Sequence, residues 1–361
     1  MRKQKNGIIF IAQNLTAPGG IESVSRMIVE NLSLYGITQV VDLNRKVKTG
    51  VIRYLSRISS LPQIFQIIFL VSFRNYSRIM ISHVAIAKFL LIISRKTRIL
   101  ILCHGGEVWQ NKKLLKLASE KRITWVAVSQ FTKKKMEEFV GQQRVFANEI
   151  RLLRLSSPIF SYDTKSSFRK APLSFLCVSR LDKTSRYKGV DTAIQIFNSI
   201  LLKHPSARLT IVGAGNDIKY YSELISRLDL EKSICLKGYL TQEELAEEYL
   251  RNQFFLLPGR PTISRVKSEG EGFGIVFIEA SYFGAIPIGG IGDGAESAII
   301  QNLTGLLVDG RKIDEASNQI LEIIDDESKL NEMMKQGRNF VVSNHSDINF
   351  EFDLQKALEK L

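Results

Sequence analysis

Two kinds of hydrophobic pattern alternate along the 361 residues of this chain. Short continuous apolar runs are typical of buried strands, and longer segments with an apolar residue at every third or fourth position are typical of helices. In the first half the pattern predicts strands at Ile8–Ala12, Ile79–Ser82, Ile99–Cys103 and Trp125–Val128. In the second half it predicts strands at Ser174–Val178, Arg208–Val212, Ile234–Leu236, Phe254–Leu257, Ile286–Ile288 and Gly305–Val308. Runs of this kind favour parallel sheets that are covered by helices.

Helical segments lie between the predicted strands, for example at Asp191–Leu202 and Gln242–Arg251. This alternation predicts an α/β protein with two Rossmann-like domains whose parallel sheets face each other across a cleft. The pattern stops around Ser156–Pro158, and the polar stretch up to Pro172 is typical of a connector. We therefore expect an N-terminal domain, a C-terminal domain and a final helix that packs back on the N-terminal domain, at residues 1–165, 166–340 and 341–361 respectively. Ligands of such sheets bind at the carboxyl ends of the strands, so the expected site is the cleft.

Charge is distributed unevenly between the two halves. The whole chain has a formal net charge of +14, but residues 1–165 carry 27 Lys and Arg against 9 Asp and Glu, and the remaining residues carry 23 against 27. No acidic residue occurs between Asp42 and Glu107. The first domain is therefore expected to lie near something anionic. Nucleic acid fits poorly, because no zinc-finger, RNP or basic-zipper pattern is present, and an anionic membrane surface is the favoured partner.

The apolar segment Leu61–Phe73 lies inside this basic region, and it is too short for a membrane-spanning helix. Two interpretations remain open: an interfacial helix on a membrane, or a core helix under a solvated basic loop. The first residues lead into a strand rather than a signal peptide. Cys103, Cys177 and Cys235 form no Cys-x-x-Cys pair, as expected in a reducing compartment. We expect a cytoplasmic protein that is peripheral on the inner face of the cell membrane.

The most specific motif is the segment Glu271–Glu279, in which two carboxylates bracket a glycine-flanked phenylalanine and an apolar run. Its two glycines allow the backbone to approach a ligand closely. The apolar run predicts a helix directly after this turn, and a helix N-terminus suits a phosphate group. The two carboxylates can then bind hydroxyl groups on either side of that phosphate. The segment therefore indicates binding of a sugar–diphosphate–nucleoside.

Three further motifs follow predicted strands. Gly19-Gly20 opens a helix over about residues 23–34 and suits a phosphate or an acceptor, although tight strand–helix packing explains it equally well. His104 comes directly after a strand, where a functional and a structural histidine are about equally expected. Gly213 and Gly215 resemble a dinucleotide-binding turn, but Ile218 stands where the third glycine would be. An oxidoreductase is therefore disfavoured, and a glycine turn under a nucleotide still fits.

Positive charge for a diphosphate would come from Arg180, at the end of the first strand of the second domain, and from one of Lys183, Arg186 and Lys188. The chain contains no Asp-x-Asp pair, no Gly-x-x-x-x-Gly-Lys-Ser/Thr loop and no metal-ligand spacing of histidines and cysteines. We therefore expect neither a metal nor a cofactor. The diphosphate would be neutralised by the basic side chains and by helix N-termini.

Taken in order, these motifs resemble the retaining glycosyltransferases of the GT-B fold, in particular glycosyltransferase family four, over nearly the whole chain. The resemblance rests on Gly19-Gly20-Ile21, His104-Gly105, Val126-Ala127-Val128-Ser129, Arg180…Lys188-Gly189, Val212-Gly213-Ala214-Gly215 and Glu271…Glu279. The family's arginine and lysine normally lie closer together than they do here. Lys188 is chosen as the partner of Arg180, because Lys188 leads into a helix as the family's lysine does.

The resemblance implies how the donor would be held. Glu279 would bind the ribose hydroxyls of the nucleoside, and Glu271 would contact hydroxyls of the donor sugar. The phosphates would be held by the backbone N–H groups of Phe273, Gly274 and Ile275.

The resemblance also implies how the sugar would be transferred. Arg180 and Lys188 would stabilise the departing diphosphate, which is the main electrostatic task in the transition state. His104 would position the donor sugar. The acceptor hydroxyl would attack from the face that the diphosphate leaves, and a phosphate oxygen would take its proton, so that the anomeric configuration is retained.

These expectations predict a metal-independent retaining glycosyltransferase of the hexosyltransferase class, active in bacterial surface polysaccharide assembly. The donor would be a nucleoside-diphosphate sugar, with UDP favoured over GDP, and the acceptor would be a glycan or a lipid-linked acceptor. Two alternatives remain open: a nucleotide-sugar epimerase or hydrolase of the same fold, which would convert the donor alone, and a non-catalytic sugar-nucleotide-binding subunit.

Overall fold

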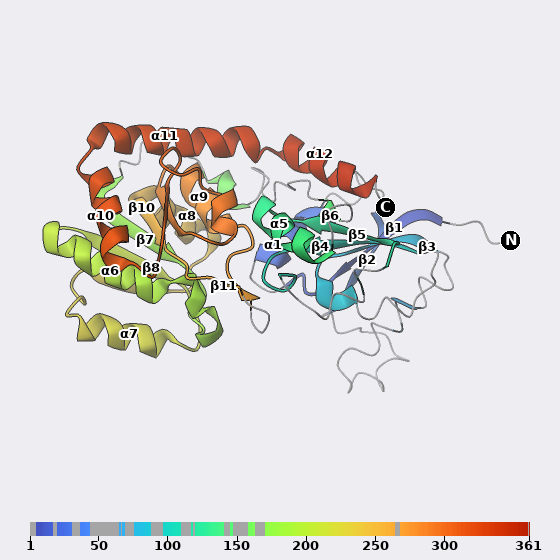
Figure 1. Cartoon of the computed structure of the whole chain (residues 1–361), viewed down its shortest axis with the longest axis horizontal. Helices are drawn as coiled ribbons and strands as arrows, with labels where there is room; N and C mark the ends of the chain where they lie inside the picture. Colours follow the sequence, from blue (N-terminus) through green and yellow to red (C-terminus); the bar gives the residue numbers. More distant parts are fainter. Residues whose placement is uncertain are drawn as a thin grey trace. The chain divides into compact units, whose positions relative to one another are not determined.

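The computed structural model describes residues 5–16, 20–30, 37–43, 65, 67–68, 76–87, 97–109, 117, 120–140, 145–146, 158–162, 170–263, 268–359 and 361. The chain divides into two compact units (Figure 1). The first unit comprises Met1–Leu152 together with Ile348–Leu361, and the second comprises Leu153–Asp347. The chain therefore returns to the first unit at its C-terminal end, and each unit is described separately below.

The first unit is built on a six-stranded parallel sheet with the order β2-β1-β3-β4-β5-β6. Its strands are β1 (Lys5–Ala12), β2 (Ile37–Asp42), β3 (Tyr76–Ile81), β4 (Arg98–Cys103), β5 (Ile123–Ala127) and β6 (Val145–Phe146). The four strands predicted from apolar runs in this half are confirmed, and their central residues are buried. The sequence analysis missed β2, in which polar residues interrupt the apolar run, and β6, which has only two residues.

The helices of this unit include α1 (Gly20–Glu30), η3 (Val84–Ile86), α5 (Gln130–Val140) and α12 (Asp347–Leu358). The α1 helix begins at the second glycine of the Gly-Gly turn, three residues before the expected start. Most of the apolar segment Leu61–Phe73 lies outside the described residues, apart from Phe65, Ile67 and Ile68. Within the part of the chain that the structure describes, none of the helices has the length and apolar composition that a membrane crossing requires.

The second unit contains a six-stranded parallel sheet with the order β14-β13-β10-β7-β8-β9. Its strands are β7 (Ala171–Val178), β8 (Arg208–Val212), β9 (Ile234–Gly238), β10 (Asn252–Leu257), β13 (Ile286–Gly290) and β14 (Leu306–Val308). All six strands predicted in this half are confirmed. Numbered within the unit, the order is 3-2-1-4-5-6, the doubly wound arrangement whose direction reverses between its first and fourth strands. That switch point lies between β7 and β10.

Helices and short turns connect these strands. They are η5 (Pro158–Ser161), η6 (Lys183–Lys188), α6 (Val190–Lys203), α7 (Ile218–Arg227), α8 (Gln242–Arg251), α9 (Ile275–Tyr282), η7 (Gly294–Ser297), α10 (Ile313–Ile324) and α11 (Glu327–Asn344), together with the hairpin strands β11 (Thr262–Ile263) and β12 (Ser268–Glu269). The α8 helix begins with a capping box, in which the Thr241 hydroxyl accepts from the N–H of Glu244 and the Glu244 carboxylate accepts from the N–H of Thr241. Both helices expected by range, Asp191–Leu202 and Gln242–Arg251, are confirmed as α6 and α8.

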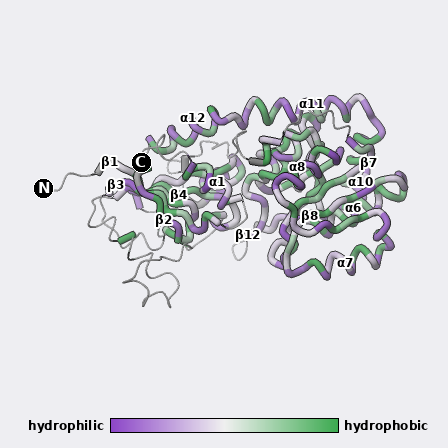
Figure 2. Tube along the Cα trace, turned by 180° about the vertical axis from the view of Figure 1, so that it is seen from behind, coloured by the Kyte–Doolittle hydropathy of each residue, from purple (hydrophilic) through white to green (hydrophobic). Residues whose placement is uncertain are grey.

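The hydropathy of the residues differs between the sheets and the helices in both units. Figure 2 shows hydrophobic residues along β4 and β8, and mixed hydrophilic and hydrophobic positions along α11 and α12. In the second unit α6 packs against α10, and α9 packs against α11. The Phe175 ring lies at the centre of the second sheet, stacked on Phe254 with ring centroids 4.8 Å apart. This rigid core fixes where the loops leave the strand ends.

Candidate active site

The loops that leave β7, β10 and β13 are packed backbone to backbone at the carboxyl edge of the second sheet. A Cβ on Gly189 would lie 2.2 Å from the carbonyl oxygen of Pro258, and one on Gly290 would lie 2.2 Å from that of Gly259. Gly189 also has a φ of +83°, which side-chain-bearing residues rarely adopt. The loop after β10 is therefore fixed against the start of α6 and the end of β13. This is the switch point at which doubly wound sheets bind ligands.

Lys188 and Glu271 form an ion pair at this edge, 83 residues apart in the sequence. The side chains keep 17% and 16% of their exposure, so the pair is shielded but reachable. Burial alone would lower the pKa of Lys188, but the adjacent Glu271 carboxylate outweighs it, and the pKa of the ammonium group is raised. Lys188 is therefore charged at neutral pH.

Arg180 leaves the end of β7 as an exposed side chain. Among the described residues it has no ion-pair partner, and its charge opposes protonation of Lys188 and favours ionisation of Tyr187. Two cations are thus close together, with the carboxylates of Glu271 and Glu269 beside them. Of the two cations, Arg180 has an exposed guanidinium whose donors can bind a diphosphate.

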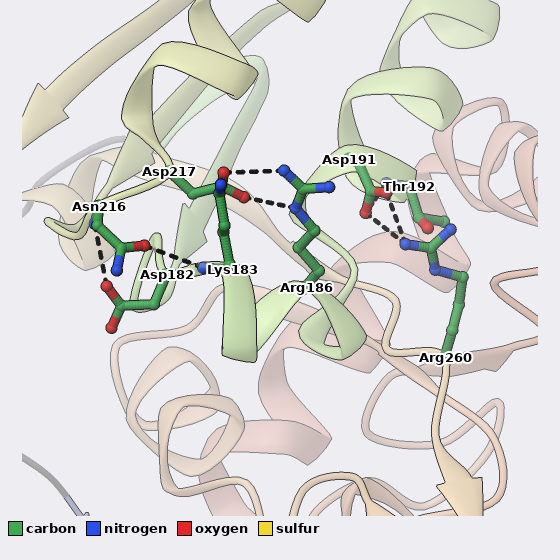
Figure 3. Close-up of polar contacts among 8 residues, drawn as sticks. All are labelled: Asp182, Lys183, Arg186, Asp191, Thr192, Asn216, Asp217 and Arg260. Atoms are coloured by element: carbon green, nitrogen blue, oxygen red, sulfur yellow. Dashed lines mark hydrogen bonds and ion pairs between the residues drawn. The ribbon is translucent and has the colours of Figure 1, made fainter.

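The other candidate partners of Arg180 have different surroundings (Figure 3). Arg186 donates from Nε and Nη2 to both carboxylate oxygens of Asp217, at 2.5 and 2.8 Å. Its guanidinium also lies 3.8 Å from the centre of the Tyr220 ring. Lys183 is exposed, and its backbone N–H donates to the side chain of Asn216 at 3.2 Å. Of the three, only Lys188 is paired with the first glutamate of the motif.

A further ion pair, half-buried, lies beside the C-terminal end of η6 (Figure 3). Arg260, in the loop after β10, donates from Nη2 to both oxygens of Asp191 at 2.7 and 2.6 Å. The backbone N–H of Arg260 donates to the carbonyl of Tyr187 at 2.7 Å. The segment that carries Lys188 is therefore held on one side by Asp217 and on the other by Arg260.

Asp293 fixes the loop that carries Glu271. Asp293 is 1% exposed, and its two oxygens accept from the N–H groups of Glu271 and Ala295 at 2.9 and 3.0 Å. Burial raises the pKa of Asp293 to about 7, although its hydrogen bond from the N–H of Glu271 opposes the shift. The N–H of Gly294 returns a bond to the carbonyl of Glu271 at 2.7 Å. The sequence analysis missed this residue, although an aspartate between two glycines after a strand is a signal for such a turn.

The expected helix after the turn is confirmed as α9, with Gly274 as its N-cap residue at a φ of +85°. A Cβ at this position would lie 2.5 Å from Cδ2 of Phe277, so the glycine is required by packing as well as by conformation. In the first turn of α9 the N–H of Phe277 donates to the carbonyl of Gly274 at 3.0 Å, and the N–H groups of Ile275 and Val276 have no partner within the helix. Phe273 is 8% exposed and places the turn against the core. The turn therefore presents backbone donors in a fixed position, as a phosphate site requires.

Glu279 lies one turn further along α9, and its Oε2 accepts from the hydroxyl of Tyr249 at 2.9 Å. The side chain is half-buried, and burial raises the pKa of its carboxyl to about 7, while the hydrogen bond from Tyr249 opposes the shift. Tyr249 is a further residue that the sequence analysis did not identify. Its position in the middle of an ordinary amphipathic helix gives no signal for it.

Gly213 is explained by packing. A Cβ there would lie 1.8 Å from the carbonyl oxygen of Ser179, and the N–H of Leu181 donates to the carbonyl of Ala214 at 3.0 Å. The glycine turn therefore lies directly against the end of β7, the strand end from which Arg180 emerges. Whether Gly213 also contacts a nucleotide stays a prediction.

Two predicted site residues, His104 and Gly20, belong to the first unit. His104 follows β4, its backbone N–H donates to Oε1 of Glu107 at 2.6 Å, and its Nε2 lies 2.8 Å from the carbonyl oxygen of Ser82. Burial lowers the pKa of His104, with Glu107 opposing, so the ring is neutral at neutral pH. Because a carbonyl only accepts, Nε2 carries the proton, and Nδ1 is left as an acceptor. Gly20 is exposed at the start of α1, while Pro18 and Gly19 lie outside the described residues.

No cluster of three or more His, Cys, Asp or Glu side chains suited to a metal ion occurs among the residues that the structure describes. The groups brought together at the switch point of the second sheet are cations, backbone N–H groups and carboxylates. These groups suit a ligand that combines a diphosphate with several hydroxyls.

Comparison with known proteins agrees with this chemistry. Residues 160–340 match the family described as Glycosyl transferases group 1. The chain is 31% identical over 168 residues to the GDP-mannose-dependent alpha-(1-6)-phosphatidylinositol monomannoside mannosyltransferase of Mycobacterium tuberculosis, a match that covers 46% of this chain and 42% of the relative. It is 26% identical over 265 residues to the GDP-mannose-dependent monoacylated alpha-(1-6)-phosphatidylinositol monomannoside mannosyltransferase of Corynebacterium glutamicum, over 68% of this chain and 65% of the relative. The chain thus spans less than two thirds of the length of these relatives.

The fold has a match over nearly its full length among solved structures. The Anabaena protein HepE, solved in complex with UDP and glucose, superposes with a TM-score of 0.70 at 16% sequence identity, over 99% of this chain and 100% of that one. At this identity the likeness concerns the fold alone. The family match covers half of the chain, including every second-unit residue discussed above. The protein is therefore a member of the glycosyl transferases group 1 family of enzymes, with the two parallel-sheet units of the GT-B fold.

Proposed function

We propose that this chain is a retaining glycosyltransferase that moves a sugar from a nucleoside-diphosphate sugar to a glycan or lipid-linked acceptor without a metal ion. The observation that carries the proposal is the grouping of Arg180, the Lys188–Glu271 pair and the N-terminus of α9 at the switch point of the second sheet. Cations there would hold the diphosphate, and the carboxylate would bind sugar hydroxyls.

Each group would have a distinct task in the reaction. The bond between the anomeric carbon and the diphosphate oxygen breaks, and the acceptor oxygen bonds to the same face of that carbon. The acceptor proton passes to an oxygen of the departing diphosphate. Arg180, Lys188 and the N–H groups at Gly274 and Ile275 stabilise the charge that develops there. His104, with a neutral ring and an open Nδ1, would accept from a donor-sugar hydroxyl.

Replacement of Glu271 tests the assignment. Glu271→Ala removes the sugar contact and leaves Lys188 without its counter-charge, so we expect transfer to be abolished while the protein stays folded. Glu322→Ala, which removes an exposed carboxylate from α10, is the matched control and should transfer normally. Transfer is measured as release of nucleoside diphosphate in the presence of acceptor, and folding by the midpoint of thermal unfolding. Full activity of the folded Glu271→Ala protein would refute the proposal.

The base and the sugar of the donor are the finer part of the proposal. The sequence-based preference was UDP over GDP, whereas the mycobacterial and corynebacterial relatives are GDP-mannose-dependent by name, which supports GDP. A thermal-shift panel of UDP- and GDP-sugars decides between them, because a ligand that binds the folded state raises its stability. Conversion of a donor without any acceptor would instead support an epimerase or hydrolase. Binding without turnover over a broad acceptor panel would support a non-catalytic subunit.

The acceptor and the location of the enzyme are further parts of the proposal. The excess of basic residues in residues 1–165 supports a peripheral position on the anionic inner face of the cell membrane. The names of the relatives, which act on phosphatidylinositol mannosides, support a lipid acceptor. Vesicles containing anionic lipid should bind the protein at low salt and release it at high salt. Lack of binding at low salt would remove the membrane part and leave the transfer reaction untouched.

A further inference from the structure

Tyr249 contacts the second glutamate of the motif from a neighbouring helix. It lies on α8 with 0% exposure, and its hydroxyl donates to Oε2 of Glu279 on α9 at 2.9 Å. Its ring is stacked on Phe283, with centroids 5.8 Å apart and planes within 5°, and it also contacts Phe255. Its backbone carbonyl accepts from Nζ of Lys170 at 2.6 Å. Ring and backbone are both fixed, so the hydroxyl is a preorganised donor.

A carboxylate has about four acceptor positions, and Tyr249 occupies one of them. The bond to Oε2 restricts rotation of the carboxylate and leaves Oε1 open. A ribose presents two neighbouring hydroxyls, and each can donate to an oxygen of one carboxylate. We propose that Tyr249 is a positioning residue that holds Glu279 in the orientation and acceptor state that nucleoside binding requires. This inference rests on the proposed function, in which Glu279 binds the ribose.

Whether Glu279 can accept hydrogen bonds with both oxygens depends on its ionisation, and its carboxyl ionises near neutral pH. Burial raises the pKa of its carboxyl to about 7, and the hydrogen bond from Tyr249 opposes that rise. Only the ionised carboxylate accepts from both hydroxyls, so nucleoside binding should weaken as the pH falls through this pKa. Without the tyrosine hydroxyl the pKa of Glu279 rises further, and the loss of binding moves to higher pH.

No other titratable group competes for this effect among the described residues. The α9 helix packs against η5, β13 and α11, against β10 through Phe277 and Phe255, and against α8 through Tyr249. Of the causes of the shift in the pKa of Glu279, burial and Tyr249 are the two that act. Other charged or titratable groups lie around Tyr249 and Tyr282 and contribute nothing to this shift: Lys170 at the Tyr249 carbonyl, Cys177 near Tyr249, and Arg338 over the Tyr282 ring.

Tyr249→Phe tests the inference, because the ring stays in its aromatic contacts and only the hydroxyl is lost. Binding of GDP and UDP to the full chain is measured by calorimetry between pH 6 and pH 8.5. We expect about 10-fold weaker binding of the preferred nucleotide at pH 7, the scale of one hydrogen bond to a charged acceptor, and a smaller deficit at pH 8.5. In turnover the variant should raise KM for the donor more than it lowers kcat.

Tyr221→Phe is the matched control. Tyr221 is also a fully buried tyrosine of the second unit, and its hydroxyl has no hydrogen-bond partner among the described residues. This variant should bind as the unaltered protein does at every pH. Glu279→Gln should bind weakly without pH dependence, and adding Tyr249→Phe to it should change nothing further.

The outcomes separate the two proposals. If the unaltered protein binds neither nucleotide, the proposed function fails. If it binds one, and Tyr249→Phe matches it at all pH values, the positioning role is refuted. A loss of equal size at every pH would also refute it, because that result indicates a purely structural tyrosine.

Discussion

Arg186 and Lys188 lie two residues apart on η6, and their surroundings are opposite. Arg186 gives two hydrogen bonds to Asp217, whose side chain is 3% exposed, and its guanidinium lies over the Tyr220 ring, so its charge is matched by one buried carboxylate. Lys188 meets a single oxygen of Glu271, on a different loop, with the unpaired Arg180 nearby. The first pair is bidentate, and the second is a contact to a single oxygen with a further cation close by.

This difference separates a structural ion pair from a ligand site. In the bidentate pair both carboxylate oxygens of Asp217 compensate the charge of Arg186, so the pair attracts a diphosphate less than an uncompensated cation would. The two groups of the Lys188–Glu271 pair can bind different parts of a sugar donor. The ammonium group can bind phosphate, and the carboxylate can bind sugar hydroxyls. Sequence alone cannot make this distinction, because basic loop residues look alike until their neighbours are known.

The largest effect is expected when Lys188 is replaced. Lys188→Ala removes a cation from the departing diphosphate, so we expect transfer to slow by about 10²–10³-fold, the scale of removing one preorganised charge-stabilising donor. Lys183→Ala removes an exposed lysine from the same short helix and should stay within about 3-fold. Both rates are measured at saturating donor. Similar losses in the two variants would show that the cluster around Lys188 has no special role.

A smaller effect is expected when Asp217, the partner of Arg186, is replaced. Asp217→Asn cannot accept both guanidinium donors, so η6 should loosen and Lys188 should lose its fixed position. We expect kcat/KM to fall by about 10-fold, because small displacements of a catalytic group are costly. Asp182→Asn is the control, since the asparagine still offers an oxygen to the N–H of Asn216, which Asp182 accepts at 3.0 Å. If Asp217→Asn behaves like this control, the pair with Arg186 does not position Lys188.

The sequence predicted the architecture because its signals are local. Apolar runs such as Phe254–Leu257 are buried on both faces of a sheet, and every such run that was identified forms a strand. The turn and the helix after Glu271 were predicted for the same reason, since Gly274 has a conformation and a neighbour that few other residues tolerate. Local signals could not reveal Tyr249 or Asp217. Both act through partners about 30 residues away, and those partnerships exist only after α8, α9 and the loop after β8 have packed.

The role of Asp293 also depends on a partner that is distant in the sequence. Its position between two glycines was visible, but its task of accepting from the N–H of Glu271 depends on a contact across 22 residues. The resemblance already favoured Lys188 over Arg186, but the pairing of Arg186 depends on Asp217, which the sequence gives no reason to place beside η6. The motif Glu271–Glu279 is thus local, while the residues that hold it in place are not.

The smallest effect concerns the pH dependence of the stability that the Arg186–Asp217 pair contributes. The hydrogen bonds from Arg186 lower the pKa of Asp217 below its ordinary value of 3.8. A carboxyl whose pKa is lower in the folded state stabilises the protein above the ordinary value, and this contribution disappears as the pH falls through the folded-state pKa. Asp217→Asn should therefore have a lower urea midpoint than the unaltered protein at pH 7, and the difference should shrink below about pH 4. A difference of constant size from pH 7 to pH 3 would show that Asp217 stabilises η6 through packing and not through its charge, and the comparison with Lys188 would then rest on geometry alone.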